Sequence, residues 1–406
     1  RQFHPNIYKE EKIFRQEGWH YEMEDENAPL TINGVVYNEM KGAFSSPDEV
    51  LQRVMMNSLY PDTTYGVESG GDPKDIPDLT YENFLAFHQK YYHPSNSYIY
   101  LYGNMDMAER LDYLDREYLS HYEEKKVDSE VKLQEPFAEI KHVAVEYPIG
   151  SDENEAENAY LTYNATVGDT LDRELYIAFQ VLDYALCTAP GAPLKRALLE
   201  KGIGTDIYSI YENGIKQPYF SIVSKNADEK QEKEFVETVE EVLGKIVKDG
   251  FDKKALYAAL SHYEFKYREA DFGSTPKGLM YGLQMLDSWL YDDAKPFIHV
   301  EANATFAALK KKVEEGYFEE LVKKYLIENT QKSILLLLPR KGLTEKSDKE
   351  LEEKLAAYKA GLTKEEIAKI IADSKALKEY QDSEDAEEDL QKIPLLTRED
   401  MNCLLY

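Results

Sequence analysis

The run Tyr160-Leu161-Thr162-Tyr163-Asn164 is rich in aromatic and β-branched residues, which indicates a β-strand. Strand-like and helix-like runs alternate on either side of it, up to about residue 341. The other predicted strands are 143–147, 206–211, 219–223 and 333–338, and the predicted helices lie near 173–186, 193–200, 229–248, 253–268 and 305–327. This mixture predicts an α+β protein in which a helical layer covers one face of a sheet.

From Ser347 onward the pattern is purely helical. Two capping boxes, Ser347 with Glu350 and Thr363 with Glu366, predict two helix starts, and Gly361 predicts the end of the first helix. Apolar residues on the two arms can then face each other. They are Leu351, Leu355 and Tyr358 on the first arm and Ile367, Ile370 and Ile371 on the second, with Ser374 beside them. We therefore expect a helical hairpin within residues 342–406.

The first part of the chain predicts mainly helices. Pro47, preceded by Ser46, suits a helix start, and Thr80 caps a second helix that His93-Pro94 ends. Residues 98–102 predict a short strand closed by Gly103-Asn104. A charged connector at 123–135 follows. The predicted domains are therefore 1–122, 136–341 and 342–406.

The composition is strongly acidic. The chain has 406 residues, with 77 acidic and 48 basic side chains and a net charge of −29. Such a charge repels phosphate backbones and anionic headgroups, so we expect neither a nucleic acid nor a membrane partner. The charge is explained by a solvated surface, and a chamber that attracts basic peptides is the alternative.

Two features bear on where the protein works. The two cysteines, Cys187 and Cys403, cannot build a disulfide framework, so a reducing compartment is expected: a bacterial-type cytoplasm, or an organelle matrix as the alternative. No signal pattern opens the chain. The abrupt start Arg1-Gln2-Phe3-His4-Pro5 leads us to expect that further sequence precedes it.

The common catalytic motifs are missing. Zinc peptidases place two histidines and a glutamate at helical spacing, as in H-E-x-x-H or H-x-x-E-H. None of the eight histidines has that context, and His88 and His93, five positions apart, point about 140° away from each other on a helix. We interpret both as packing or capping residues. Cys187 lies in an apolar helical run, which predicts a buried, inert thiol.

Specific motifs nevertheless connect the chain to a known family. The segment Gly34-Val35-Val36-Tyr37-Asn38-Glu39-Met40-Lys41-Gly42-Ala43-Phe44 closely resembles the presequence-protease branch of the pitrilysin/insulinase clan of zinc metallopeptidases. Further matching motifs are Phe3-His4-Pro5, Gln16-Glu17-Gly18-Trp19, Tyr65-Gly66-Val67, Ser69-Gly70-Gly71-Asp72-Pro73, His93-Pro94-Ser95-Asn96, Tyr102-Gly103-Asn104 and Gly191-Ala192-Pro193-Leu194. The resemblance covers essentially the whole chain.

The resemblance implies a fold and one metal ligand. It implies two-layer sheet-and-helix domains of the mitochondrial-processing-peptidase-like type and a hairpin that joins two halves. Residues 1–122 would be the C-terminal part of the catalytic domain, and 136–341 a second, non-catalytic domain. In the family two histidines of an H-x-x-E-H motif and a distant glutamate hold Zn²⁺. Glu39, on a predicted helical segment, matches that glutamate, whereas no catalytic residue falls within this chain.

The implied function is a zinc metalloendopeptidase that degrades short unstructured peptides in an enclosed chamber. This chain alone is expected to be inactive, because zinc sites use at least three protein ligands. Its expected partners are unfolded peptides and the missing N-terminal and C-terminal parts of the same protein. The alternative is a non-catalytic half or partner subunit that binds peptides or completes another chain's chamber. An unpaired sheet edge would favour self-association of the truncated chain.

Overall fold

The computed structural model describes residues 6–398, in two compact units. The first unit comprises residues 39–347, and the described part of the second comprises 6–38 and 348–398. Phe3-His4-Pro5 and Cys403, quoted above, lie outside the described residues. The division passes through helix α2, Val35–Ala43, between Asn38 and Glu39.

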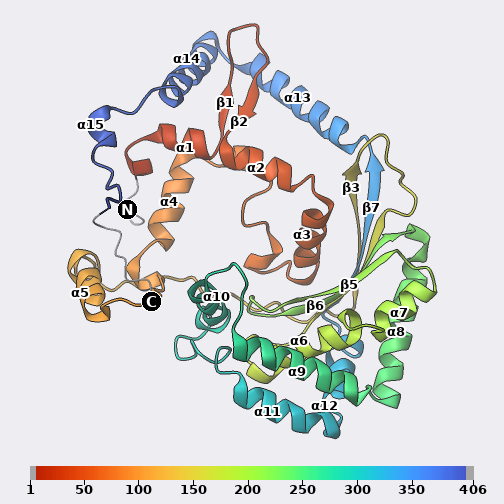
Figure 1. Ribbon diagram of the computed structural model, residues 1–406. Coiled ribbons are helices and arrows are strands. Elements are labelled where there is room, and N and C mark those ends of the chain that lie inside the picture. Colours follow the sequence, from red (N-terminus) through yellow and green to blue (C-terminus); the bar gives the residue numbers. More distant parts are fainter. Residues whose placement is uncertain (1–5, 399–406) are drawn as a thin grey trace. The chain divides into compact units, whose positions relative to one another are not determined.

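A five-stranded sheet organises the first unit, in the order β3-β7-β4-β6-β5 (Figure 1). Its strands are β3 Lys141–Ile149, β4 Ala159–Thr166, β5 Asp206–Glu212, β6 Tyr219–Ala227 and β7 Lys332–Lys341. Strands β3 and β7 are parallel, and the other neighbouring pairs are antiparallel. All five strands predicted between residues 143 and 338 are present, and the α+β class is confirmed.

Helices cover one face of this sheet and close the main core. The core buries alternate residues of β4, including Leu161 and Tyr163, against apolar side chains of the helices, including Phe179 and Phe235. The helices of the unit after the connector are α6 Arg173–Asp183, α7 Pro193–Glu200, α8 Glu232–Asp249, α9 Lys253–Glu269, α10 Lys277–Trp289, α11 Asn303–Lys312 and α12 Tyr317–Leu321. This helical layer agrees with the sequence prediction.

Helix α3, Pro47–Leu59, covers the opposite face of the sheet (Figure 1). Its Val50, Leu51 and Met55 pack against a second cluster that includes Tyr147 and Leu337. Every residue of β4 is consequently buried. The sequence predicted only one covered face, because the pattern of α3 does not reveal which strands it meets.

A β-hairpin and a helical hairpin organise the second unit. The β-hairpin pairs β1 His20–Glu22 with β2 Thr31–Asn33, and it follows α1 Glu11–Glu17. The helical hairpin consists of α13 Leu343–Gly361 and α14 Lys364–Gln381, followed by a short helix, α15 Glu387–Leu390. Met23 and Leu30 join the apolar residues of both arms in one cluster. The predicted facing residues therefore meet, although the sequence did not predict the β-hairpin beneath them.

Polar contacts fix the β-hairpin to the helices. Ser374 Oγ accepts a hydrogen bond from the Met23 N–H at 3.2 Å, and Lys359 Nζ donates to the Ala28 carbonyl at 2.6 Å. The rings of Tyr21 and Tyr358 stack with their centroids 5.0 Å apart. The helical hairpin is thus a packed element of its unit.

Three predictions about element boundaries were wrong. Helix α13 begins at Leu343, after Gly342 in a left-handed conformation, so Ser347 lies inside the helix and caps nothing. The single helix expected over 305–327 is divided at Gly316, whose φ of +77° ends the first part. The strand expected at 98–102 is not formed among the described residues, because no other strand lies beside it.

The N-terminal part of the first unit also contains α4 Tyr81–Tyr91 and α5 Met107–Glu117. Thr80 caps α4 as predicted, in a capping box with Asn83. Pro47 begins α3 as predicted, but the Ser46 side chain makes no capping hydrogen bond. Within residues 6–398, no helix is both long and apolar enough to cross a bilayer.

Candidate functional site

Glu39 lies on the exposed side of α2. Tyr37, two positions earlier, is buried at 3% exposure, and a two-residue step turns a helix by about 200°. Burial of Tyr37 therefore directs the Glu39 carboxylate outward, where it is exposed. The helix expected for this segment is confirmed, and the metal role of Glu39 stays a prediction.

Two of the quoted motifs meet at the start of α2. Gly34 has a φ of +143°, and a Cβ there would lie 2.3 Å from the carbonyl oxygen of Gly18. The Tyr37 N–H donates to the same Gly18 oxygen at 3.3 Å. Only glycine permits this approach of two backbones, so the Gln16–Trp19 and Gly34–Phe44 motifs form one packed corner.

Two further contacts hold the end of α2 within the first unit. A Cβ at Gly70 would lie 2.3 Å from the Met40 sulfur, so the turn at 68–73 packs directly on the residue after Glu39. The Arg53 guanidinium of α3 lies 3.5 Å from the ring centroid of Phe44. Burial lowers the pKa of Arg53, although nearby acidic residues oppose that shift. The segment around Glu39 is thus anchored on both sides.

The histidines do not gather around Glu39. His88 is buried and stacks on Tyr92, and His93 accepts a hydrogen bond from the Ser95 N–H, so the predicted packing and capping roles are confirmed. Among residues 6–398, no three His, Cys, Asp or Glu side chains are arranged to hold a metal ion. His4 lies outside the described residues. The described residues therefore do not fit a complete zinc site, and Glu39 supplies at most one ligand.

Cys187 is buried, as predicted, in a π-helical turn that follows α6. Burial raises the pKa of its thiol to about 12. A thiol with such a pKa remains protonated at neutral pH and is a poor nucleophile. It offers no nucleophile for a peptidase mechanism.

A buried polar cluster lies in the first unit, away from the quoted motifs. The Tyr176 hydroxyl donates to Asp287 Oδ2 at 2.7 Å, and its ring stacks on His299 with centroids 3.6 Å apart. Burial raises the pKa of Asp287 to about 6 and lowers the pKa of His299 to about 4. His299 is buried and Asp287 is half-buried, and neither side chain lines the hollow that α10 borders.

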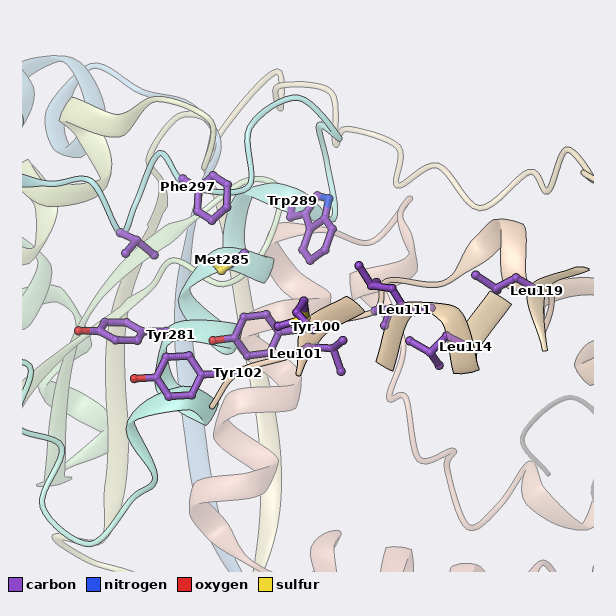
Figure 2. Close-up of a pocket in the computed structure, with 13 residues that line it drawn as sticks. Tyr100, Leu101, Tyr102, Leu111, Leu114, Leu119, Tyr281, Met285, Trp289 and Phe297 are labelled. Atoms are coloured by element: carbon purple, nitrogen blue, oxygen red, sulfur yellow. The ribbon is translucent and has the colours of Figure 1, made fainter. Parts of the chain in front are cut away.

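The sequence patterns did not predict α10, which borders an apolar hollow of the first unit (Figure 2). Gly278 and Gly282 are four positions apart on α10, and Tyr102 and Tyr100 fill the space above them. The sequence does contain a signal for this helix. It is a Gly-x-x-x-Gly spacing within an apolar stretch, which lets another segment of the chain approach a helix closely.

Two family models match the sequence. The model described as "Peptidase M16 inactive domain" matches residues 78–263, and a model for an associated domain of the same peptidase family, subfamily C, matches residues 337–403. Together they place the chain in the class of M16 peptidase domains, the class that the resemblance implied. The domain boundaries predicted above stay predictions.

Curated relatives align with nearly the whole chain. Protein HypA of Clostridium perfringens is 45% identical over 399 residues, covering 98% of this chain and 41% of that protein. Presequence protease 1, chloroplastic/mitochondrial, of Arabidopsis thaliana is 36% identical over 409 residues, covering 98% of this chain and 38% of that protein. The chain therefore spans about two fifths of the length of these relatives.

Solved structures share the fold. A protease from Helicobacter pylori superposes with a TM-score of 0.58 at 16% identity, over 75% of this chain and 70% of that one. The peptidase M16 inactive domain from Pseudomonas fluorescens superposes with a TM-score of 0.54 at 19% identity, over 75% of this chain and 69% of that one.

The chain belongs to the M16 (pitrilysin) family of peptidases, in its presequence-protease branch.

Proposed function

We propose that this chain is part of a zinc metalloendopeptidase that cleaves short unstructured peptides inside an enclosed chamber. The observation that carries the proposal is an exposed carboxylate, Glu39, on a helix anchored by the motifs on which the resemblance to presequence proteases rests. Because the described residues contain no group of three potential metal ligands, the rest of the site is proposed to come from other parts of the protein.

The proposed role of Glu39 follows from its chemistry. A carboxylate oxygen is a normal zinc ligand, and a catalytic site takes three protein ligands. Zinc, when bound, would activate a water molecule for attack on a peptide bond. The contacts of Met40 with Gly70 and of Phe44 with Arg53 would keep the Glu39 carboxylate directed outward.

The cellular setting and substrates belong to the same proposal. We place the protein in a reducing compartment, either a bacterial cytoplasm or an organelle matrix, because its one described cysteine is a buried free thiol. Unfolded peptides are the proposed substrates, and the strongly negative charge favours basic ones. Neither nucleic acid nor a membrane is a proposed partner.

The test uses the purified 406-residue chain and a longer polypeptide that carries an H-x-x-E-H segment. We expect the chain alone to retain no equimolar zinc by elemental analysis and to cleave no fluorogenic peptide. In the longer polypeptide, Glu39→Gln should lower bound zinc and hydrolysis together, whereas Glu352→Gln, on the exposed face of α13, should change neither. Equimolar zinc on the isolated chain that depends on Glu39 would overturn the proposal.

The second candidate is a non-catalytic half that binds peptides or completes another chain's chamber. The description of the model matching residues 78–263 as an inactive M16 domain favours it. Titration with unstructured peptides separates the two candidates. Saturable binding without any hydrolysis, even in the longer polypeptide with zinc, would favour the non-catalytic half.

A further inference from the structure

Helix α3 packs on the five-stranded sheet mainly through apolar side chains. Its Val50, Leu51 and Met55 are buried in one cluster with Leu335 and Leu337 of β7. Such contacts are strong but not directional, and an interface made only of them loses a unique arrangement before it loses stability. By themselves they would let α3 shift along the sheet or turn about its axis. A single placement of α3 therefore needs directional contacts.

A row of polar side chains crosses this apolar interface. Asn164 of β4 stands opposite Ser333 of β7 on one side and Ser221 of β6 on the other, and all three are fully buried. Burying a polar group costs free energy unless it is hydrogen-bonded, and apolar residues of similar size would fill this space without that cost. In some proteins, buried polar groups of this kind fix the register of packed elements. The row can therefore supply the direction that the apolar contacts lack.

One chain of hydrogen bonds connects this row to α3. Asn164 Nδ2 donates to Ser333 Oγ at 3.2 Å. The Ser58 hydroxyl of α3 donates to the Met55 carbonyl at 2.8 Å, so the Ser333 hydroxyl donates in the 2.7 Å hydrogen bond between Ser333 and Ser58. Hydrogen bonds linked in this way inside a protein strengthen one another. Ser58 lies in the last turn of α3, so the chain of hydrogen bonds fixes that end of the helix.

A second polar contact fixes the other end of α3. The Tyr160 hydroxyl donates to Asp48 Oδ1 at 3.2 Å, from the same face of β4 as Asn164. Lys225 Nζ of β6 lies 3.3 Å from the same carboxylate oxygen. Asp48 is in the first turn of α3, where a carboxylate also interacts favourably with the helix dipole. Contacts at both ends of the helix together oppose sliding and rotation.

Helix α3 in turn holds the end of α2. The Arg53 guanidinium lies 3.5 Å from the ring centroid of Phe44, which follows α2 directly. Asn57 Nδ2 donates to the Gly66 carbonyl at 2.7 Å, just before the turn that packs on Met40. Both contacts come from α3 and would move with it. A change in the register of α3 would therefore displace the end of α2.

We propose that Tyr160 and Ser333 of the sheet are positioning residues that select one register of α3 and thereby set the position of the Glu39 carboxylate. Strands β4 and β6 lie within the residues matched by the inactive-domain model, whereas α2 and α3 precede those residues. The proposed task of the inactive domain is therefore to place the segment that carries Glu39. This proposal concerns packing within the chain and does not depend on metal binding or on peptidase activity.

Hydrogen exchange of the purified 406-residue chain tests the proposal without any metal. The double variant Tyr160→Phe/Ser333→Ala removes two hydroxyl groups and leaves the apolar packing of α3 in place. Without these groups α3 samples other registers and releases the end of α2. We expect the amides of residues 40–44 to exchange about fivefold faster than in the parent, while the amides of β4 change by less than about twofold.

Two comparisons separate positioning from general stability. Tyr163→Phe removes a buried hydroxyl from the opposite face of β4, where Tyr163 donates to the Leu326 carbonyl at 2.7 Å. This control should not raise the exchange of residues 40–44 relative to that of β4. Asp48→Ala should reproduce part of the effect of the double variant. Asp48→Asn keeps an oxygen acceptor for the Tyr160 hydroxyl and should restore the exchange rates of the parent.

Three results would overturn the proposal. The first is unchanged exchange at residues 40–44 in the double variant. The second is an equal increase at residues 40–44 and in β4, since the two hydroxyls would then contribute only to overall stability. The third is a selective increase at residues 40–44 in Tyr163→Phe, because any buried hydroxyl of β4 would then have the same effect. Each of these results leaves the proposed peptidase function untouched, since no metal takes part in the experiment.

Discussion

Replacing Asp287 by asparagine changes how the stability of the first unit depends on pH. The Asp287 carboxyl accepts a hydrogen bond from the Tyr176 hydroxyl, and burial raises its pKa from 3.8 to about 6. Asparagine has nearly the same shape and keeps a carbonyl oxygen for Tyr176. The substitution therefore removes the titration while preserving the packing.

The sign follows from the raised pKa. Between pH 3.8 and about 6 the folded protein holds a proton that the unfolded chain has released. The stabilisation from this group is complete below pH 3.8 and is lost as the pH rises through about 6. From a shift of about two pKa units, its contribution at pH 5 exceeds that at pH 8 by about 1.4 kcal/mol.

We therefore compare the free energy of unfolding of Asp287→Asn with that of the parent. The difference, variant minus parent, should be higher at pH 8 than at pH 5 by about that amount. The pKa of His299 is lowered to about 4, so its contribution to the free energy of unfolding decreases as the pH falls below 6.5. Because His299 is present in both proteins, this contribution cancels in the comparison. Urea unfolding followed by Trp289 fluorescence in a Trp19→Phe background reports on this unit.

The control is Asp75→Asn, at an exposed aspartate that caps nothing. Its effect on the free energy of unfolding should be the same at pH 5 and pH 8. If the difference in the free energy of unfolding between Asp287→Asn and the parent is also the same at pH 5 and pH 8, Asp287 is not desolvated in the folded protein and the prediction is wrong.

Two other predictions concern single contacts. Thr363→Ala should destabilise the second unit by about 1 kcal/mol, because it removes the capping box in which Thr363 Oγ1 accepts a hydrogen bond from the Glu366 N–H. Circular dichroism during urea unfolding measures the loss of stability, and an unchanged unfolding midpoint would contradict the prediction. In a Cys403→Ser background, Cys187 should react with a thiol reagent only at the rate of unfolding, since its pKa is raised to about 12; rapid labelling of the folded chain would refute that.

Local patterns predicted the features that depend on nearby residues. The five strands of the first unit, the helix cap at Thr80, the capping box at Thr363 and the facing residues of the helical hairpin all follow from periodicity and capping chemistry. The family also came from sequence, because its motifs are contiguous. The Gly34–Phe44 segment was recognisable without knowing what it contacts.

Features that depend on distant partners required the tertiary structure. The Tyr98–Tyr102 segment has the composition of a strand, but a strand also needs a neighbouring strand to pair with. In the described chain, α10 packs against the tyrosines of this segment, and no strand pairs with its backbone. The burial of β4 on both faces likewise depends on α3, which is about a hundred residues away in sequence.

Sequence alone established the α+β class, the strands, the hairpin arms and the identity of Glu39 as the residue that matches a family ligand, because each of these is encoded within a few neighbouring residues. The folded chain was needed to show that Gly34 packs on Gly18, that Met40 packs on Gly70 and that Glu39 is left exposed between these anchors. Those facts depend on chain segments meeting across long separations, and side-chain periodicity carries no information about which segments meet.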